Sequence, residues 1–525
     1  MREFNTNDPI LTCSESLAFE KKYFQGQEEK EWEAMNQAGE AIGDHLLRDM
    51  RELRTIPHHP RILVLVGKGH NGGDALLAAK RLMKTIPTAR AVIWGIVPWD
   101  QCRPLCQRAY RDLIELVGKR VEEVENLKSL SEIKKLELVY DRLIEKSGFS
   151  ASIDGIMGMG AKLPIRAPLS GLFSMINQSD CIAVRAAVDL PSGLTEDSGK
   201  EVLRADFTYA TGVAKTPVIE SRNLHWTGRL RYIDLGFFDK YSQDFENHKK
   251  RVMKNRSLGK LRNLRSASSD KRSNGHLFLL AGSRNLAGAA MMSAQAALKA
   301  GIGLLTVGIP ESLHSSFAAQ RPEAMWVPLP ETPKGGLALE GLGKIKSFLG
   351  SVDAFATGPG LGKEAETHAL IRETLKFFRG PAVLDADALQ ISILSNLEPT
   401  KGLILTPHAG EFKRIANSKS PAEYSLESKC VLVLKGPHTQ IYFDEICYNC
   451  LGGSSVLARG GSGDLLTGML GALLAKYPAN PLDSSLLGVQ WHGRAGEVLA
   501  RQHGQEAVYA TDLLNYLSFA MRNDI

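Results

Sequence analysis

The feature that most constrains this chain is a series of short, wholly apolar runs that alternate with helical stretches. The first run, Ile62–Val66, contains no polar residue, which is typical of a strand buried on both faces of a parallel sheet. Further strands are expected at 91–97, 151–157, 182–188 and 207–211, and helices at 15–54, 75–84 and 105–117. Alternating strands and helices predict an α/β domain with a mostly parallel sheet.

A second series of the same kind begins at residue 274. Strands are expected at 276–281, 304–309, 354–357, 382–385, 403–406 and 431–435, with a helix at 287–300 closed by Gly301. The segment 246–273 is rich in Lys, Arg, Ser and Asn and has no sustained apolar period, so it is expected to be a solvated linker. Because 525 residues exceed what one core supports, we expect two α/β domains, at 1–245 and 274–525.

The composition fits a folded protein and excludes some classes of partner. Hydrophobic residues make up 43% of the chain, and a net charge of +6 is too mild to indicate a nucleic-acid partner. The seven cysteines are scattered along the chain, which is typical of a protein from a reducing compartment. Cys447-x-x-Cys450 lacks a second cysteine pair at metal spacing, so a zinc site is not expected. No signal core or membrane-spanning run is present, so a cytoplasmic location without a membrane partner is expected.

Three glycine-bearing, polar loops of the first half begin where apolar strands end. They are Gly67–Asp74, Asp154–Pro164 and Asp189–Gly193. Taken singly, Asp154 and Asp189 could each cap a turn. Because the carboxyl ends of parallel strands lie along one edge, where such folds bind ligands, the three loops together predict a site. Glycines at a helix start also let backbone N–H groups approach an anion.

The second half has its own candidate site, centred on Gly460–Asp464. This loop opens a helix expected to run to Lys476, so its backbone N–H groups can form an anion hole, and Asp464 can accept a proton from an attacking hydroxyl. No Gly-Lys-Ser/Thr follows, which excludes a Walker loop. Four other polar or glycine-rich blocks follow strands: 358–362, 385–389, 406–411 and 434–439.

Residues 10–240 resemble the NAD(P)H-hydrate epimerase domain, through Asn71-Gly-Gly-Asp74, 154–164, Asp189-Leu-Pro-Ser192-Gly193 and Ala214-Lys215. The resemblance implies a Rossmann-like domain that binds hydrated NADH and NADPH, with Asp189 as the proton-transfer group. It implies a potassium ion held by Asn71, Asp154 and Ser192. The substrate-binding residues it implies are His70, Asn71, Gly72, Gly73, Asp74, Gly158, Met159, Gly160, Ala161, Lys162, Leu163, Pro164 and Asp189. The chain departs from the family pattern at His70, usually asparagine, and at Ala75, usually glycine.

Residues 270–520 resemble the ADP-dependent, in some members ATP-dependent, NAD(P)H-hydrate dehydratase domain, a ribokinase-like fold. The motif set above carries this resemblance, together with Gly282-Ser283 and Arg321-Pro-Glu323. It implies that the hydrate is bound by Ala289, Gly360, His408 and Asp464. It implies that ADP or ATP, with Mg²⁺, is bound by Lys435, Gly436, Pro437, His438, Thr439 and Gly463. Arg459 stands where the family usually has threonine.

The two resemblances fit one chemistry. Hydroxide leaves the hydrated nicotinamide ring poorly, and phosphorylating that hydroxyl makes its elimination easy. A chiral dehydratase site takes the S hydrate alone, so an epimerase that interconverts the R and S hydrates supplies it. The family association also suggests a homo-oligomer. An alternative is a small-molecule kinase of the ribokinase-like fold with a non-catalytic N-terminal binding module. The sequence leaves open which nucleotide and which hydrate are preferred.

Overall fold

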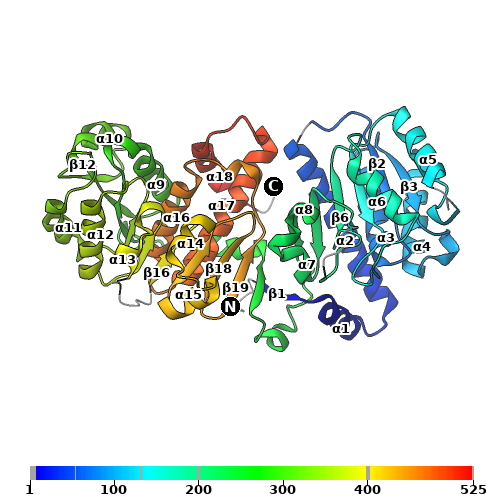
Figure 1. Ribbon diagram of the computed structural model, residues 1–525, viewed down its shortest axis with the longest axis horizontal. Helices are drawn as coiled ribbons and strands as arrows, with labels where there is room; N and C mark the ends of the chain where they lie inside the picture. Colours follow the sequence, from blue (N-terminus) through cyan, green and yellow to red (C-terminus); the bar gives the residue numbers. More distant parts are fainter. Residues whose placement is uncertain are drawn as a thin grey trace. The chain divides into compact units, whose positions relative to one another are not determined.

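The computed structural model describes residues 7–53, 55–129, 133–197, 201–395, 397 and 402–522. The chain divides into two compact units, residues 1–248 and 249–525, which are coloured blue to green and green to red in Figure 1. Within the described residues, no helix combines the length and the apolar character needed to cross a membrane.

The first unit contains a seven-stranded, wholly parallel sheet in the order β4-β3-β2-β5-β6-β7-β9. Its strands are β2 (Arg61–Val66), β3 (Arg90–Gly95), β4 (Val121–Val124), β5 (Ala151–Gly155), β6 (Arg185–Val188), β7 (Phe207–Thr211) and β9 (Arg229–Ile233). The strand order reverses between β2 and β5, which makes that point the topological switch of a Rossmann-like sheet. The predicted parallel α/β domain is therefore confirmed.

Helices cover both faces of this sheet. They are α1 (Cys13–Phe24), α2 (Glu28–Leu53), α3 (His70–Thr85), α4 (Pro104–Val117), α5 (Ile133–Lys146), α6 (Leu169–Gln178), α7 (Thr216–Ile219) and α8 (Leu224–Thr227). Alternate side chains of β2 point to opposite faces. Val64 packs in the cluster formed with α2, α3 and α4, whereas Leu63 packs in the cluster formed with α5 and α6. Two-sided burial explains why this strand has no polar residue.

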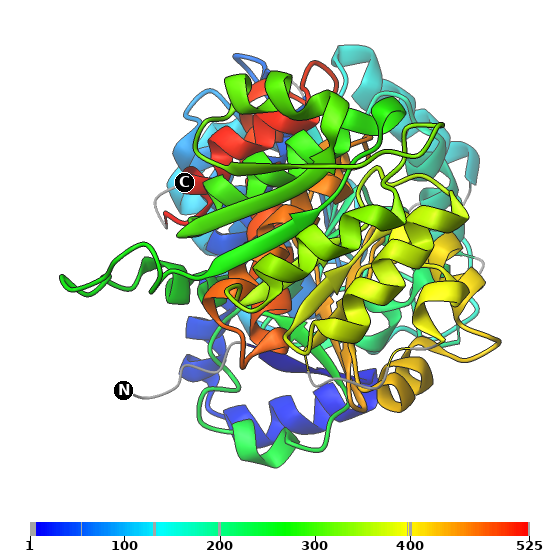
Figure 2. The ribbon, with the colours of Figure 1, turned by 90° about the vertical axis from the view of Figure 1, so that its left-hand side faces the viewer.

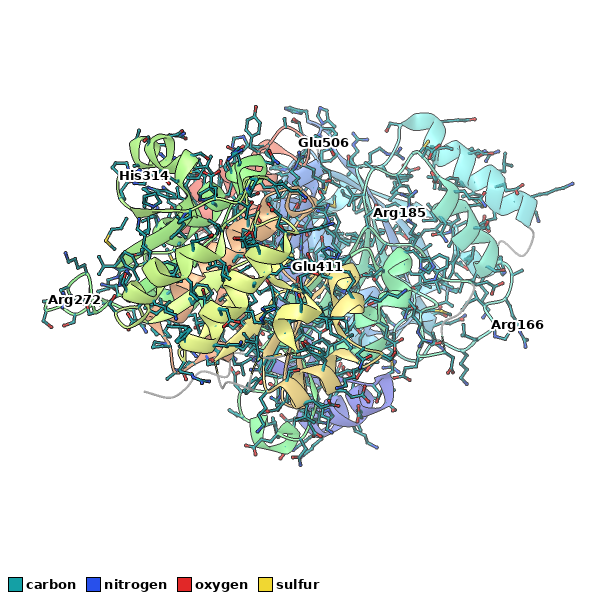
Figure 3. The ribbon with its side chains drawn as sticks, turned by 60° about the vertical axis from the view of Figure 1, so that its left-hand side comes forward. Arg166, Arg185, Arg272, His314, Glu411 and Glu506 are labelled. Carbon is teal, nitrogen blue, oxygen red and sulfur yellow. The ribbon has the colours of Figure 1, made fainter. Side chains whose placement is uncertain are left out.

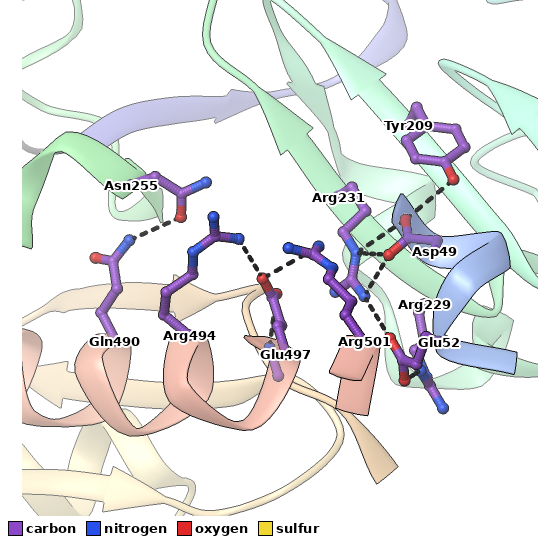
Figure 4. A network of polar contacts seen from close by, with 11 residues as sticks. Asp49, Glu52, Tyr209, Arg229, Arg231, Asn255, Gln490, Arg494, Glu497 and Arg501 are labelled. Carbon is purple, nitrogen blue, oxygen red and sulfur yellow. Dashed lines mark hydrogen bonds and ion pairs between the residues drawn. The ribbon is translucent and has the colours of Figure 1, made fainter. Parts of the chain in front are cut away.

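Buried ion pairs attach α2 to the sheet. Asp49 of α2 accepts hydrogen bonds from Arg231 of β9 at 3.1 Å and from the Tyr209 hydroxyl at 3.0 Å, as Figure 4 shows. Glu52, one turn later, pairs with Arg229. Because a buried charge without a partner is costly, these pairs fix the side of α2 that faces the sheet.

A separate pair of short strands completes the first unit. Strand β1 (Asn7–Leu11) runs parallel to β8 (Ala214–Lys215), with Leu11 opposite Lys215. The sequence pattern predicts neither strand. Both are short, and their partners lie about two hundred positions apart, so no local periodicity reveals them.

The second unit contains a mixed sheet in the order β13-β12-β11-β14-β15-β16-β17-β18-β19-β10. Pairing is parallel except along β17-β18-β19, which is antiparallel. Its strands are β10 (Lys250–Met253), β11 (His276–Leu280), β12 (Leu304–Pro310), β13 (Met325–Leu329), β14 (Ala354–Thr357), β15 (Ala382–Leu384), β16 (Leu403–Leu405), β17 (Val431–Leu434), β18 (Thr439–Phe443) and β19 (Ile446–Cys450). Figure 2 shows the green and yellow part of this unit facing the viewer.

The helices of the second unit pack on both faces of its sheet. They are α9 (Ala287–Lys299), α10 (His314–Gln320), α11 (Leu342–Leu349), α12 (Ala365–Phe377), α13 (Ile391–Leu394), α14 (Ala409–Ile415), α15 (Pro421–Ser428), α16 (Ser462–Lys476), α17 (Pro481–His503) and α18 (Leu513–Ala520). The apolar helix α16 is buried in a cluster with Leu277 and Ala356 of the sheet. On α17, Gln490 donates to Asn255, and Glu497 accepts from Arg494, as Figure 4 shows.

The segment 246–273 differs in part from the expected linker. Lys250–Met253 forms β10, which pairs with β19, and Met253 and Leu258 lie in the core of the second unit. Two or three apolar residues in a basic stretch are too few to show a period. Further on, Asp270 accepts backbone hydrogen bonds from Arg272 and Ser273, and Figure 3 shows Arg272 on a projecting loop.

Candidate active sites

At the switch point of the first sheet, backbones approach so closely that only glycine fits. A Cβ on Gly67 would lie 1.9 Å from the carbonyl oxygen of Ile156, and one on Gly155 would lie 2.4 Å from that of Asn71. The glycines therefore bring the loop after β2 against the loop after β5. The helix α3 begins earlier than expected, at His70, so Ala75 lies inside a helix. No left-handed backbone is required there.

Three side chains from these loops form an oxygen-rich cluster. The Ser192 hydroxyl donates to Asp154 Oδ1 at 2.6 Å, and the Ser192 N–H donates to Asp154 Oδ2 at 2.7 Å. The Asn71 amide donates to the Val188 carbonyl at 3.1 Å, and its oxygen faces Gly158. Burial raises the pKa of Asp154 to about 6, although hydrogen bonds from Ser192 oppose the shift.

A cavity of about 1080 Å³ opens beside this cluster. Of the predicted substrate-binding residues, those that line it are His70, Asn71, Gly158, Met159, Gly160 and Ala161. The cavity is also lined by the basic side chains of Lys21, Lys68 and Arg103 and by Glu20 of α1. Its size and basic lining suit an anionic dinucleotide.

The other predicted residues of the first site do not line the cavity. Gly72 and Gly73 are buried in the first turns of α3, where they allow close packing against Gly67 and Met35. The Asp74 side chain is half-buried beside them with its Oδ1 shielded from solvent, and burial raises the pKa of this carboxyl well above the usual value. The side chains of Lys162, Leu163 and Pro164 are exposed outside the cavity.

Asp189 has an unusual backbone and a buried cationic partner. Its φ is +64°, which is uncommon for a residue other than glycine and often marks functional sites. Lys215 Nζ donates to Asp189 Oδ1 at 2.5 Å, and both side chains are almost fully buried. His70 lies in the cavity 3.8 Å from Glu31, and burial together with Arg103 lowers the pKa of His70.

In the second unit, Lys435, Asp385 and Thr467 form one hydrogen-bonded group. Lys435 Nζ donates to Asp385 Oδ1 at 2.6 Å, and the Thr467 hydroxyl donates to Asp385 Oδ2 at 2.6 Å. A Cβ on Gly463 would lie 3.5 Å from Lys435 Nζ, so the glycine loop lies directly beside this group. The group is assembled from three elements: Asp385 follows β15, Lys435 follows β17, and the glycine loop leads into α16.

Asp464 faces this group from the first turn of α16. Burial and the charge of Asp385 raise the pKa of Asp464 to about 6, and the positive charge of Lys435 opposes them. The loop reaches the helix through Gly461, whose φ is +93°. The helix begins at Ser462, three residues before the predicted start; the Ser462 N–H donates to the Arg459 carbonyl at 3.3 Å, and the N–H groups of Gly463 and Asp464 follow in the first turn.

The remaining predicted residues lie on neighbouring strand ends. A Cβ on Gly360 would lie 2.9 Å from Ala289 Cβ, so these two residues are adjacent. His408 caps α14, and its Nδ1 accepts the N–H groups of Gly410 and Glu411. Figure 3 labels Glu411 on this helix. A backbone bridge joins His408 to Lys435. The turn 436–438 follows, and β18 begins at Thr439.

Two residues around the glycine loop act as supports. Arg459 donates through one guanidinium nitrogen to the carbonyl oxygens of Gln505 and Glu506, at 2.6 and 2.8 Å, so it anchors the loop and does not enter the anion hole. His492 is buried in α17, with Nε2 at 3.1 Å from the Ser462 carbonyl oxygen. Burial lowers the pKa of His492 to about 4, so its ring is neutral near pH 7.

Comparison with known proteins places the chain in one family. The family model described as NAD(P)H-hydrate dehydratase matches residues 277–518, and that described as YjeF-related protein N-terminus matches residues 32–217. The bifunctional NAD(P)H-hydrate repair enzyme Nnr of Gloeobacter violaceus is 36% identical over 469 residues, covering 85% of each chain. This chain belongs to that family.

Other members of the NAD(P)H-hydrate repair enzyme family are also similar. The Nnr of Moorella thermoacetica is 33% identical over 484 residues and covers 88% of each chain. A crystal structure of ADP/ATP-dependent NAD(P)H-hydrate dehydratase from Bacillus subtilis, with ATP/Mg²⁺, is 30% identical and has a TM-score of 0.43. It covers 49% of this chain and 92% of that chain. The predicted family is confirmed.

Sequence reasoning missed several residues of this repair enzyme's sites. Glu20 lies on α1, before the segment that the family model matches, and no motif marks it. Lys215 is part of a recognised motif, but nothing in the sequence shows that it pairs with Asp189. Thr467 and His492 lie on apolar helices and read as core residues. Thr467 lies four residues after Gly463, so the two residues share one face of α16. That spacing is the one feature of the sequence that could have placed Thr467 at the site.

Proposed function

We propose that this protein repairs hydrated NADH and NADPH in two steps. The first unit, assigned to residues 1–245, interconverts the R and S hydrates. The second, assigned to residues 274–525, removes water from the S hydrate at the expense of ADP or ATP. The observation that supports this most is Asp464, a carboxyl of raised pKa at the start of α16 beside the buried Lys435–Asp385 pair.

In the second site, the group that accepts the proton is Asp464. As the ring hydroxyl attacks the terminal phosphoryl group, its proton passes to the Asp464 carboxylate. The N–H groups at the start of α16 stabilise the charge that develops on the phosphoryl oxygens. The phosphate then leaves the ring with the electron pair of the carbon–oxygen bond, and the neighbouring ring carbon loses a proton to the departing phosphate, which restores the double bond.

The nucleotide has a suitable place beside this base. Lys435 to Thr439 and Gly463 would hold the nucleotide, and Ala289, Gly360 and His408 would contact the hydrate. Mg²⁺ supplies charge neutralisation when it is bound with nucleotide phosphates, which are its usual oxygen ligands. The carboxylate of Asp387, whose charge acts on Asp464, is a protein oxygen that fits next to such an ion. Asp385 is already engaged by Lys435 and Thr467.

In the first site, Asp189 is the group assigned to proton transfer. The cavity beside Asn71 and Gly158 would hold the nicotinamide end of the hydrate. Asn71, Asp154 and Ser192 fit a potassium ion, because Asp154 and Ser192 bring carboxylate and hydroxyl oxygens together in a buried pair, the Val188 carbonyl holds the Asn71 amide through its nitrogen, and hard cations prefer oxygen ligands. When bound there, the ion would supply positive charge near the substrate.

Product analysis tests the dehydratase assignment. The full chain is incubated with the S hydrate of NADH, Mg²⁺ and either nucleotide, and the products are identified by mass spectrometry. We expect NADH, inorganic phosphate and a nucleotide shortened by one phosphate, with loss of activity in Asp464→Asn. A stable phosphorylated product would contradict the lyase and favour a kinase.

A second assay, without nucleotide, tests the epimerase assignment. Dehydration does not occur without nucleotide, so interconversion of the R and S hydrates can be followed by chromatography. We expect the full chain to bring either pure epimer to the same equilibrium mixture. A rate equal to the uncatalysed one would refute the epimerase assignment and favour a binding module.

A further inference from the structure

A single buried ammonium group lies among several carboxyl groups behind the first cavity. Lys215 is 1% exposed and donates to Asp189. Burial lowers the pKa of Lys215, but the charges of Asp189 and Glu20 raise it more, so the pKa ends above its usual value. The charges of Asp189 and Glu20 also raise the pKa of the Asp74 carboxyl, and the charge of Lys215 lowers it. Lys215 is therefore the common neighbour of three carboxyl groups.

One ammonium group cannot neutralise the three carboxylates of Asp189, Glu20 and Asp74. Asp189 has the direct hydrogen bond to Lys215. The pKa of Glu20 is raised by burial and by Asp189 and Glu31, against the lowering effect of Lys215 and of the Ser16 hydroxyl. The charge of Glu20 itself raises the pKa of Asp74. Asp189 thus has the direct hydrogen bond to Lys215, whereas burial and neighbouring charges favour the protonated forms of Glu20 and Asp74.

Of the two carboxyls that favour the proton, only Glu20 reaches the cavity. The side chains of Leu17, Glu20, Lys21 and Phe24 on α1 line its wall, whereas Asp74, in the second turn of α3, is not among the residues that line the cavity. The Ser16 hydroxyl donates to Glu20 Oε1 at 3.2 Å, which orients the carboxyl. Strand β1 places α1 here, because Leu11 pairs with Lys215 and the helix begins at Cys13. The segment before the matched family model thus completes the site.

We propose that Glu20 is a second proton-transfer group of the epimerase site and that Lys215 is the positioning residue that divides the protons between Glu20 and Asp189. This inference rests on the proposed epimerase function and names the residues that balance its chemistry. Glu20 lines the cavity where the substrate would lie, and Lys215 acts through the two carboxyls.

The reaction balances with these two groups. The hydroxyl sits on a ring carbon bonded to the ring nitrogen. The nitrogen lone pair expels the hydroxyl, which takes the Glu20 proton and leaves as water, so the carbon–oxygen bond breaks and an iminium forms. Water then adds to the other face and its proton passes to the Asp189 carboxylate, and transfer of that proton from Asp189 to Glu20 returns the enzyme to its starting state. The reverse reaction uses the same groups in exchanged roles, as an epimerase at equilibrium requires.

The titratable groups that surround Glu20 and Lys215 determine how the rate of epimerisation should depend on pH. Besides Lys215, Asp189 and Asp74, the groups that face Glu20 and Lys215 are Glu31 of α2 and Cys13 of α1. Burial and the charge of Glu196 raise the pKa of Cys13 to about 12, so the thiol stays neutral near pH 7. Loss of the Glu20 proton should therefore give the alkaline limb of the epimerisation profile.

The test compares Glu20→Gln with wild type in the full chain, using pure epimers of hydrated NADH without nucleotide. We expect kcat to fall about 100-fold, the usual contribution of one proton-transfer group, with KM within about twofold of wild type. The alkaline limb should disappear. Glu33→Gln, an exposed carboxyl-to-amide change on α2, is the matched control and should leave the rate and profile unchanged.

Lys215 is tested by two variants, one that removes its positive charge and one that keeps it. Lys215→Met should shift the pH profile and Lys215→Arg should restore part of it, which a purely structural role would not produce. Dehydration of the pure S hydrate by the same preparations shows that the second unit is folded, and the thermal melting curve of each variant, compared with that of wild type, shows whether the first unit is folded. A Glu20→Gln enzyme with wild-type rate and profile would overturn the inference while the epimerase assignment stands. An inactive wild type would overturn both.

Discussion

The pKa of Asp464 gives the dehydratase a predictable pH dependence. As the base, Asp464 must be ionised, and its pKa is about 6 because burial and Asp385 outweigh Lys435. About 91% of the enzyme is then active at pH 7 and about 9% at pH 5, so the rate should fall roughly tenfold between them. The sign follows from the role: activity is lost as the pH falls through 6 and stays level above it.

The charge of Lys435 sets where this inflection lies. Lys435 lowers the pKa of Asp464, so Lys435→Met should move the inflection to higher pH, and Lys435→Arg, which keeps the charge, should leave it near 6. The assay is kcat for the pure S hydrate at saturating nucleotide, from pH 4.5 to 8.5, so that weaker nucleotide binding does not enter. A rate that is flat from pH 5 to 8, or an inflection that does not move in Lys435→Met, would refute Asp464 as the base.

Three further outcomes are expected. Gly461→Ala should cost about 1–3 kcal/mol of local strain and abolish dehydration while epimerisation persists, because φ is +93° and the added Cβ would lie 2.5 Å from Met292 Sδ; equal loss of both activities would contradict this. Asp74→Asn should flatten the pH dependence of thermal stability. The folded pKa of Asp74 is raised, so its stabilising contribution is complete at acid pH and is lost as the pH rises; an unchanged curve would count against a buried proton. Asp154→Asn should remove any acceleration of epimerisation by potassium over sodium, and undiminished acceleration would place the ion elsewhere.

Much of the fold could be predicted because its causes are local. Ile62–Val66 reads as a strand because both faces are buried, and Gly67 and Gly155 appear where backbones touch. The strand pair of Leu11 and Lys215 could not be predicted, because it depends on a partner about two hundred positions away. Strand β10 was hidden in a basic segment whose apolar residues are too few to show a period.

In the candidate sites, too, the residues within local motifs could be predicted, and those that depend on distant partners could not. Motif residues such as Asn71 and Asp464 were found because glycine loops surround them. The Asp385–Lys435 hydrogen bond joins two strand ends fifty residues apart, and the pattern of each strand end alone does not show which carboxyl the lysine selects. Glu20 was missed because a single glutamate on a charged helix carries no local signal. Its raised pKa arises from burial and from neighbours on other elements.

Recovery of NADH from a mixture of its R and S hydrates tests the central claim most directly. The full chain, Mg²⁺ and ADP or ATP are added, and the return of the near-ultraviolet absorbance of NADH is followed. The account predicts complete recovery in one phase, and, in Asp189→Asn, rapid recovery of the S share alone followed by a slow uncatalysed phase. No recovery with either nucleotide would contradict it.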